Sequence, residues 1–202
     1  MQEVSDRGRF MVKVCGITNF EDGELAVELG ASMLGVVRTR SSPRYAGSEL
    51  FSLLRPLGVP LVGVYTSMNE IPEVPEEDIV QLHFDHGRSE IESVKRRGKT
   101  VISVITYRSV PDFIERYENL RAAGADLIML ERKEGIVALG KPLLHLSMMY
   151  DFGISGKISN DEIEFIREIK PKFIDLSSSL EEYPGKKDRM KMERFFRLLG
   201  GN

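Results

Sequence analysis

Two side chains that can exchange protons stand at the ends of short apolar runs. Cys15, the one cysteine of the chain, closes the run 11–15, and Glu131 follows the run 126–130. A thiol and a carboxyl are groups that act in acid–base catalysis. Each also has a plainer interpretation, because free cysteines are often buried and inert, and Glu131 opens the charge-rich stretch 131–134, where a solvated acid is ordinary.

The elements that must position these groups alternate between strand and helix. Apolar runs predict strands at 11–15, 33–37, 61–65, 79–84, 100–105, 126–130, 151–155 and 173–177. Helical patterns separate most of them, whereas Pro72 and Pro75 predict an irregular connection over 69–78. Eight strands in such alternation predict a parallel sheet.

Local signals predict where some helices begin and end. Residues 18–21 resemble a capping box, in which the Thr18 and Glu21 side chains bind free amides of a new helix. Gly30 can end that helix in the left-handed conformation. Asn160 can cap a later helix.

Length favours a closed barrel. The chain has 202 residues, of which 42% are hydrophobic, and an eight-fold barrel needs roughly 200 residues. An open doubly wound sheet with two fewer units is the alternative, but no G-x-G-x-x-G turn follows the first strand. We therefore predict one compact (β/α)8 TIM barrel over 11–202, preceded by an N-terminal extension at 1–10.

Composition argues against several classes of function. A formal net charge of −3 gives no basic footprint for nucleic acid. No apolar run approaches the roughly 20 residues of a membrane span. A single cysteine allows no intrachain disulfide and argues against a cysteine-based metal site. The polar start lacks the apolar core of a secretory signal, so we expect a cytoplasmic protein.

The opening strand resembles that of the phosphoribosylanthranilate isomerase family. Residues 11–18 read M-V-K-V-C-G-I-T, and the family opens with K-[IV]-C-G-[IL] and a polar turn. Further similar segments follow in the family's order at 42–44 (S-P-R), 80–83 (V-Q-L-H), 125–131, 174–181 and 184–188 (P-G-K-K-D). The resemblance therefore covers residues 11 to about 195.

This resemblance implies a (β/α)8 barrel that performs an Amadori rearrangement without metal or organic cofactor. It implies that Cys15 is the general base and that Glu131 stands in place of the family's general-acid aspartate. It assigns to Arg44 the carboxylate of the anthranilate ring, which a planar guanidinium fork can bind bidentately. Arg38 and Arg40 lie close enough in sequence to be alternatives. The partner is then a small phosphorylated substrate, and the protein a monomer or homodimer.

The phosphate site departs most from the family pattern. The family has glycine-rich turns after strands six, seven and eight, where backbone amides approach phosphate. Several of those glycines are replaced here in 137–141, 155–157 and 177–179. The candidate phosphate-binding residues are Gly140, Lys141, Gly156, Lys157, Ser178 and Ser179.

Lys13 and Asp175 are predicted to pair inside the barrel. Lys13 shares a strand face with Cys15, strands one and eight become neighbours when a barrel closes, and the family has both residues. Such a pair is mainly architectural, since an unpaired buried charge is costly. His83 is interpreted as a core histidine with a hydrogen-bond partner and no catalytic role.

Two other functions remain open at this point. Glu131 and the lost glycines also fit a non-catalytic binding or regulatory relative that kept the fold. An isomerase for a different phosphosugar is the other possibility, because fold alone does not decide function.

Overall fold

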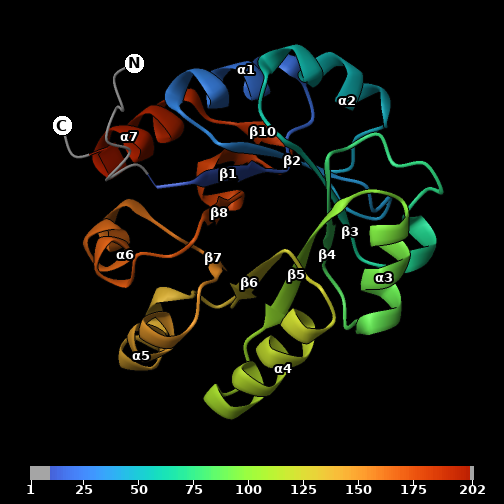
Figure 1. Ribbon diagram of the computed structural model, residues 1–202. Coiled ribbons are helices and arrows are strands. Elements are labelled where there is room, and N and C mark those ends of the chain that lie inside the picture. Colours follow the sequence, from blue (N-terminus) through green and yellow to red (C-terminus); the bar gives the residue numbers. More distant parts are fainter. Residues whose placement is uncertain (1–9, 201–202) are drawn as a thin grey trace, which may run out of the picture.

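Eight parallel strands close into a barrel in the computed structural model, which describes residues 10–200 (Figure 1). Strand order follows the chain, as predicted. The strands are β1 Val12–Cys15, β2 Met33–Val37, β3 Leu61–Tyr65, β4 Ile79–Leu82, β5 Thr100–Thr106, β6 Leu127–Glu131, β7 Gly153–Ser155 and β8 Ile174–Leu176. The closed barrel excludes the open doubly wound alternative. Of the predicted extension at 1–10, residues 1–9 lie outside the described residues, and the domain boundary stays a prediction.

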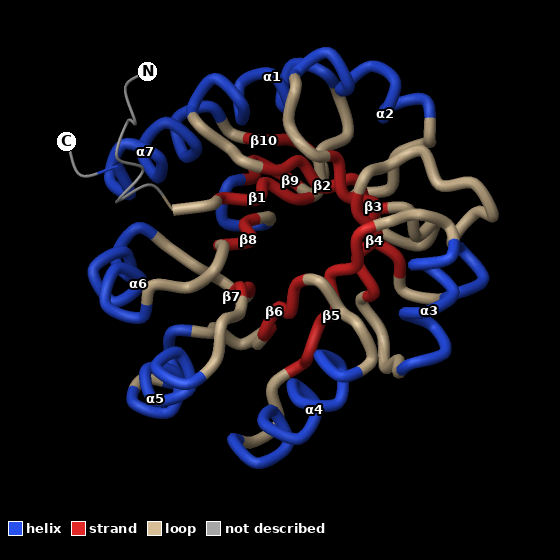
Figure 2. Tube along the Cα trace, viewed as in Figure 1, coloured by secondary structure: helices blue, strands red, loops and turns tan. Residues whose placement is uncertain are grey.

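The helices form a ring around the strands (Figure 2). They are α1 Phe20–Leu29, α2 Glu49–Leu54, α3 Arg88–Arg96, α4 Val110–Ala122, α5 Lys141–Met149, α6 Ile163–Ile169 and α7 Arg189–Gly200. Between β3 and β4 the chain makes only the 3-10 turn η2 Met68–Glu70, which confirms the irregular connection predicted from the prolines.

Barrel closure depends on the pairing of the first and last strands. Val12 lies opposite Ile174 and Lys13 opposite Asp175 in the parallel register of β1 and β8. Because side chains alternate along a strand, this register turns Lys13 and Asp175 into the barrel together. The predicted neighbourhood of these two strands is confirmed.

Two predicted helix starts are wrong by one residue. Asn19, not Thr18, caps α1, and its side chain accepts a hydrogen bond from the Asp22 amide at 2.8 Å. Thr18 instead donates its hydroxyl hydrogen to the carbonyl of Gly185, a contact with a distant segment that local patterns do not reveal. Ser159 rather than Asn160 precedes the turn leading into α6.

The core has two layers. Inward-facing side chains fill the barrel itself, among them Val62, Ile102 and Met129, and a larger apolar layer packs between the strands and the helices. β7 begins at Gly153, where the ring of Phe173 occupies the place of a side chain, 2.4 Å from an added Cβ. The glycine thus serves core packing.

Candidate active site

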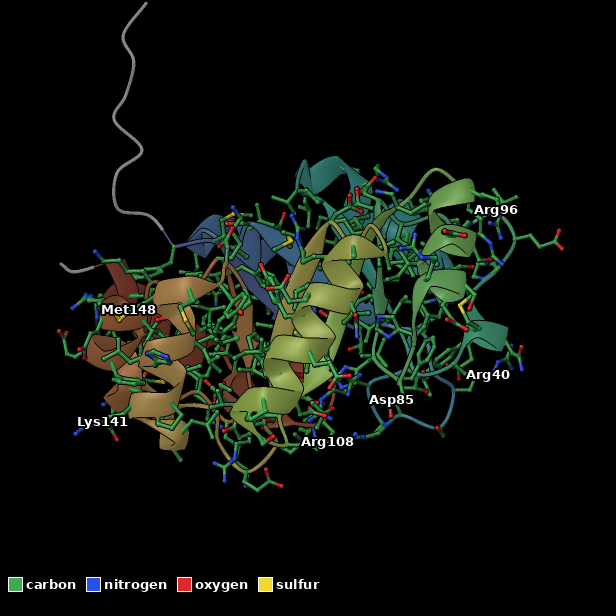
Figure 3. The ribbon with its side chains drawn as sticks, turned by 60° about the horizontal axis from the view of Figure 1, so that its bottom comes forward. Arg40, Asp85, Arg96, Arg108, Lys141 and Met148 are labelled. Carbon is green, nitrogen blue, oxygen red and sulfur yellow. The ribbon has the colours of Figure 1, made fainter. Side chains whose placement is uncertain are left out.

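A cavity of about 590 Å³ opens at the carboxyl ends of the barrel strands. Loops that follow the strands lie at this end: Asp85 and Arg108 lie near each other at the lower edge of the molecule in Figure 3, with Arg40 to their right and Arg96, the last residue of α3, higher up. Barrel enzymes build their active sites at this face. Predicted residues that line the cavity are Cys15, Arg44, Glu131, Gly156, Lys157, Asp175, Ser178 and Ser179.

Three predicted residues do not line this cavity. Lys13 lies beneath it, fully buried. Gly140 and Lys141 lie at the start of α5, and Lys141 is exposed at the edge of the molecule (Figure 3). Among the candidate phosphate-binding residues, those in the turns after β7 and β8 line the cavity and Gly140 and Lys141 do not; the phosphate-binding role of all of them stays a prediction.

Cys15 ends β1 at the floor of the cavity and is 7% exposed. Gly35 on β2 leaves room for it, since a Cβ there would come within 2.9 Å of the Cys15 sulfur and 3.0 Å of Lys13 Cε. Burial raises the pKa of the Cys15 thiol, although the positive charge of Lys13 acts in the opposite direction. The free protein therefore holds a protonated thiol next to a cation that can stabilise its thiolate.

Lys13 and Asp175 form a buried ion pair, with 2.9 Å between Lys13 Nζ and Asp175 Oδ1. Burial alone would lower the pKa of Lys13, but the charge and the hydrogen bond of Asp175 oppose burial, and the pKa of Lys13 is raised. Lys13 therefore stays charged below the thiol. The pair joins the two strands that close the barrel.

Glu131 ends β6 and contacts His83 across the cavity mouth, with 3.0 Å between Glu131 Oε2 and His83 Nε2. Burial raises the pKa of Glu131, but the hydrogen bond and charge of His83 outweigh burial and leave this pKa below its ordinary value. His83 has the predicted hydrogen-bond partner. The prediction that it is a core residue is wrong, because its side chain lines the cavity. Only the register of β4 and β6 in the closed barrel reveals this.

Arg44 enters the cavity already paired with Glu181. Arg44 Nε lies 2.8 and 3.0 Å from the two Glu181 oxygens, and Arg44 Nη2 lies 2.6 Å from Oε2. The Nε–Nη2 edge of the guanidinium fork is therefore occupied, while the end formed by Nη1 and the second Nη2 hydrogen stays available. The expected bidentate contact with a substrate carboxylate stays a prediction. Of the alternatives, Arg38 donates to the Ala46 carbonyl and does not line the cavity.

Glu181 lies on a hairpin that the sequence did not reveal. Strands β9 Glu181–Tyr183 and β10 Lys186–Lys187 pair antiparallel after β8. Burial raises the pKa of Glu181, but hydrogen bonds and charges from Arg44 and Lys187 outweigh burial and lower that pKa. Lys187 also donates to the Cys15 carbonyl at 2.6 Å, so the hairpin ties Arg44 to the strand that carries the cysteine.

The turns after β7 and β8 form the opposite end of the cavity. Gly156 has a φ of 124°, and a Cβ there would lie 2.0 Å from the Arg132 carbonyl oxygen, so only glycine fits. Lys157 follows with a φ of 45°, a left-handed backbone conformation that is unusual for a residue other than glycine. Ser178 and Ser179 follow the neighbouring strand β8 and line the same cavity. Hydroxyls and a cation at this end favour an anionic group.

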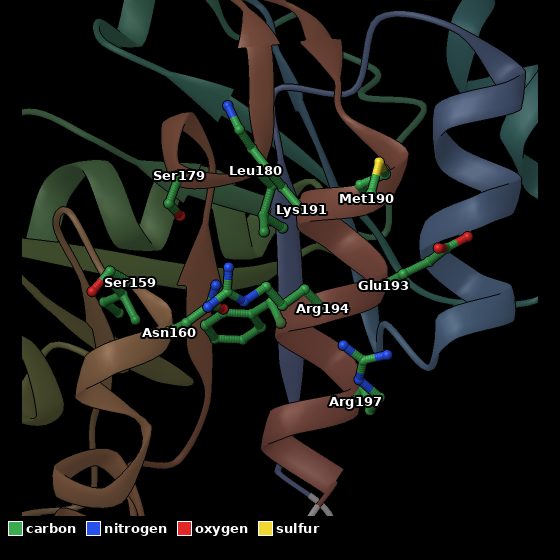
Figure 4. A pocket seen from close by; sticks show the side chains of 11 residues that line it. Ser159, Asn160, Ser179, Leu180, Met190, Lys191, Glu193, Arg194 and Arg197 are labelled. Atoms are coloured by element: carbon green, nitrogen blue, oxygen red, sulfur yellow. The ribbon is translucent and has the colours of Figure 1, made fainter.

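A second hollow of about 610 Å³ adjoins this end and shares Ser179 with the cavity (Figure 4). Cationic side chains of α7 border it, among them Lys191, Arg194 and Arg197. The carboxylate of Glu193 lines the same hollow.

Across residues 10–200 no group of three or more histidine, cysteine, aspartate or glutamate side chains is arranged to hold a metal ion. No helix within the same residues is long and apolar enough to cross a bilayer.

Comparison with known proteins places these features in a family. A family model described as N-(5'phosphoribosyl)anthranilate (PRA) isomerase matches residues 12–197. An N-(5'-phosphoribosyl)anthranilate isomerase from Thermoplasma volcanium is 41% identical over 189 residues, which cover 93% of this chain and 95% of the relative. A relative of the same name from Sulfolobus acidocaldarius is 30% identical, over 90% of this chain and 92% of its own length.

Solved structures agree with the sequence relatives. The crystal structure of phosphoribosyl anthranilate isomerase from Thermotoga maritima has a TM-score of 0.81 at 27% identity, covering 96% of this chain and all of the other. A phosphoribosyl anthranilate isomerase in complex with reduced 1-(o-carboxyphenylamino)-1-deoxyribulose 5-phosphate has a TM-score of 0.77 at 27% identity, with the same coverage. Because the family model spans nearly the whole described barrel, the chain belongs to the N-(5'-phosphoribosyl)anthranilate isomerase family.

Proposed function

We propose that this protein converts N-(5'-phosphoribosyl)anthranilate into 1-(o-carboxyphenylamino)-1-deoxyribulose 5-phosphate, an isomerisation of tryptophan biosynthesis. The observation that carries the proposal is that Cys15 and Glu131, on β1 and β6, line one cavity at the mouth of the barrel. This reaction requires one acid and one base, and both are present there. A cytoplasmic location and a monomeric or homodimeric state are part of the proposal.

The chemistry divides between these two groups. Glu131 donates a proton to the ring oxygen as the ribose ring opens, and the substrate's own nitrogen supplies electrons to form an iminium ion. The Cys15 thiolate then removes the proton from the adjacent carbon, which gives an enolamine that becomes the ketone product. The substrate nitrogen accepts the electron pair, so the residues need supply only proton transfer and positioning.

The reaction requires a protonated Glu131 and a Cys15 thiolate, which is the less stable of the two ways to place one proton on this pair. With a raised pKa at Cys15 and a lowered pKa at Glu131, the free protein holds a thiol and a carboxylate. The reactive form has the same number of protons, but the proton is on Glu131. The substrate's phosphate and carboxylate are anionic and favour protonation of Glu131, while Lys13 favours the thiolate.

The two ends of the cavity suit the two ends of the substrate. Gly156, Lys157, Ser178 and Ser179 would hold the phosphate, and Arg44 would meet the anthranilate carboxylate. The sugar then lies between Cys15 and Glu131. Holding both ends fixes the reacting carbon and ring oxygen next to the base and the acid, which is a large part of catalysis by such sites.

A steady-state assay of freshly made phosphoribosylanthranilate tests the proposal, with loss of substrate fluorescence as the signal. Wild type should turn over, and Cys15→Ala should be slower by orders of magnitude while keeping the wild-type circular dichroism spectrum. Folded wild type that binds the reduced product analogue without turnover would instead show a non-catalytic relative. Turnover restricted to other phosphosugars would show a changed substrate.

A further inference from the structure

Gln81 carries a buried amide whose oxygen has no hydrogen-bond partner within residues 10–200. The residue is 1% exposed, and its side chain lines the active-site cavity. An unpaired buried polar group costs free energy, and native proteins rarely keep one without a reason. The amide therefore needs a partner that enters through the cavity.

The surroundings of Gln81 explain why the protein itself supplies no partner. On the neighbouring strands, Val64 of β3 and Ile102 of β5 lie opposite Gln81 in the sheet register, and both belong to the apolar cluster inside the barrel. Two residues further along the chain, His83 binds Glu131 with its Nε2. Exchanging the amide oxygen and nitrogen of Gln81 by a rotation of about 180° does not supply a partner, since the nitrogen would then occupy the position without one.

The position on β4 shows what the amide can reach. Gln81 and His83 are two positions apart in the chain, so their side chains lie on the same face, and His83 contacts the acid Glu131. Cys15 lines the same cavity from β1. The part of the substrate between acid and base is the ribosyl group, whose hydroxyls can both donate to the amide oxygen and accept from the amide nitrogen.

We infer that Gln81 binds a ribosyl hydroxyl of the substrate through its side-chain amide and so holds the sugar between Cys15 and Glu131. This inference rests on the proposed function. An unpaired buried amide lowers the stability of the free protein, and its hydrogen bond with the substrate raises the affinity of the complex. Removing the amide should therefore change stability and affinity in opposite directions.

The test replaces Gln81 with an apolar side chain of similar shape. Gln81→Met should lower kcat/KM for phosphoribosylanthranilate, and affinity for the reduced product analogue measured by calorimetry, each by roughly 10-fold. Its urea midpoint should equal or exceed that of wild type, because an unpaired polar group has been removed. Gln81→Leu, a second apolar variant, should behave in the same way.

Ile79→Met is the matched control. Ile79 lies on the same strand and the same inward face, two residues before Gln81, and does not line the cavity. This variant should keep wild-type kcat/KM and analogue affinity, which separates loss of the amide from disturbance of β4.

Three results would overturn the inference. Unchanged kcat/KM and analogue affinity in Gln81→Met, with an active wild type, would remove it and leave the proposed function standing. A lower urea midpoint in both apolar variants would make Gln81 a structural residue. A folded wild type with no turnover and no affinity for the analogue would overturn the proposed function and this inference together.

Discussion

Arg44 and Glu181, 137 positions apart in the chain, form a bidentate ion pair beside the cavity, with contacts of 2.6 to 3.0 Å. Glu181 simultaneously contacts Lys187, whose side chain is fully buried, at 3.1 Å. One carboxylate thus orients the arginine proposed to meet the substrate and neutralises a lysine attached to the strand of the proposed base. We therefore expect Glu181 to affect both substrate binding and the stability of the barrel.

Glu181→Gln should therefore affect both properties. Loss of the charge leaves Lys187 buried without a counter-charge, which should cost about 3 kcal/mol in the free energy of unfolding. Arg44 loses its orientation, so KM for phosphoribosylanthranilate should rise roughly 10-fold. Urea denaturation and steady-state kinetics measure the two effects. Glu182→Gln, at the exposed neighbouring position, is the control and should resemble wild type.

The stability effect of Glu181→Gln should depend on pH. The pKa of Glu181 is lowered in the folded protein, so its stabilisation is present above the ordinary carboxyl pKa of the unfolded chain. That stabilisation is lost as the pH falls through the lower folded value. The urea midpoints of wild type and variant should then converge in acid, and a gap that stays constant would argue against the charge as its cause.

The pH dependence of kcat/KM should be a broad plateau with two limbs. The reactive form carries one proton shared between Glu131 and Cys15, so the rate falls in acid as Glu131 is protonated in addition and in alkali as Cys15 loses its proton. Because the pKa of Glu131 is lowered and that of Cys15 raised, the plateau should span neutral pH. The apparent values belong to the pair. A steep change in kcat/KM around pH 7 would contradict this assignment.

His83→Gln should move the acid limb of that profile to higher pH. His83 lowers the pKa of Glu131 through a 3.0 Å hydrogen bond and its charge, and a glutamine supplies the hydrogen bond without the charge. The alkaline limb, which reports Cys15, should stay in place. A shift of both limbs by the same amount would mean that the variant disturbs the whole cavity.

Lys13→Met should destabilise the barrel and impair catalysis. Asp175 would be left buried without its partner, at a cost of about 3 to 5 kcal/mol, and Cys15 would lose the cation that favours its thiolate. Since the pKa of Lys13 is raised in the folded protein, the stabilisation it gives is complete below the unfolded lysine pKa and is lost as the pH rises through the folded value. A Lys13→Met protein with wild-type stability and activity would end the architectural hypothesis.

Lys157→Gly should raise the stability of the protein and lower its affinity for the phosphate group of the substrate. The left-handed backbone at Lys157, with a φ of 45°, costs about 1 kcal/mol for a residue with a side chain and almost nothing for glycine. Loss of the cation should raise KM for phosphoribosylanthranilate, and weaken competitive inhibition by inorganic phosphate, each by roughly 10-fold.

Lys170→Gly provides the matched control for that variant. Lys170 has a φ of 46° at the end of α6 and does not line the cavity. It should gain similar stability without any kinetic change. If Lys157→Gly gives the same result as Lys170→Gly, Lys157 has no part in phosphate binding.

The sequence alone determined the eight strands, most of the helices and the strand ends that carry Cys15 and Glu131. Those features depend on local causes: the spacing of apolar residues, the prolines between β3 and β4, and Gly30, which ends α1 with a φ of 107°. Resemblance to a family then supplied the roles of base and acid, and the family is confirmed.

The tertiary structure decided which of those strand ends meet. The contacts of His83 with Glu131 and of Arg44 with Glu181 join residues 48 and 137 positions apart. Their existence depends on the register of a closed barrel and on a hairpin of two short strands, for which a charged, half-exposed segment gives no periodic signal. Local patterns fix backbone conformation, but only closure of β1 against β8 sets the distances between side chains on different strands.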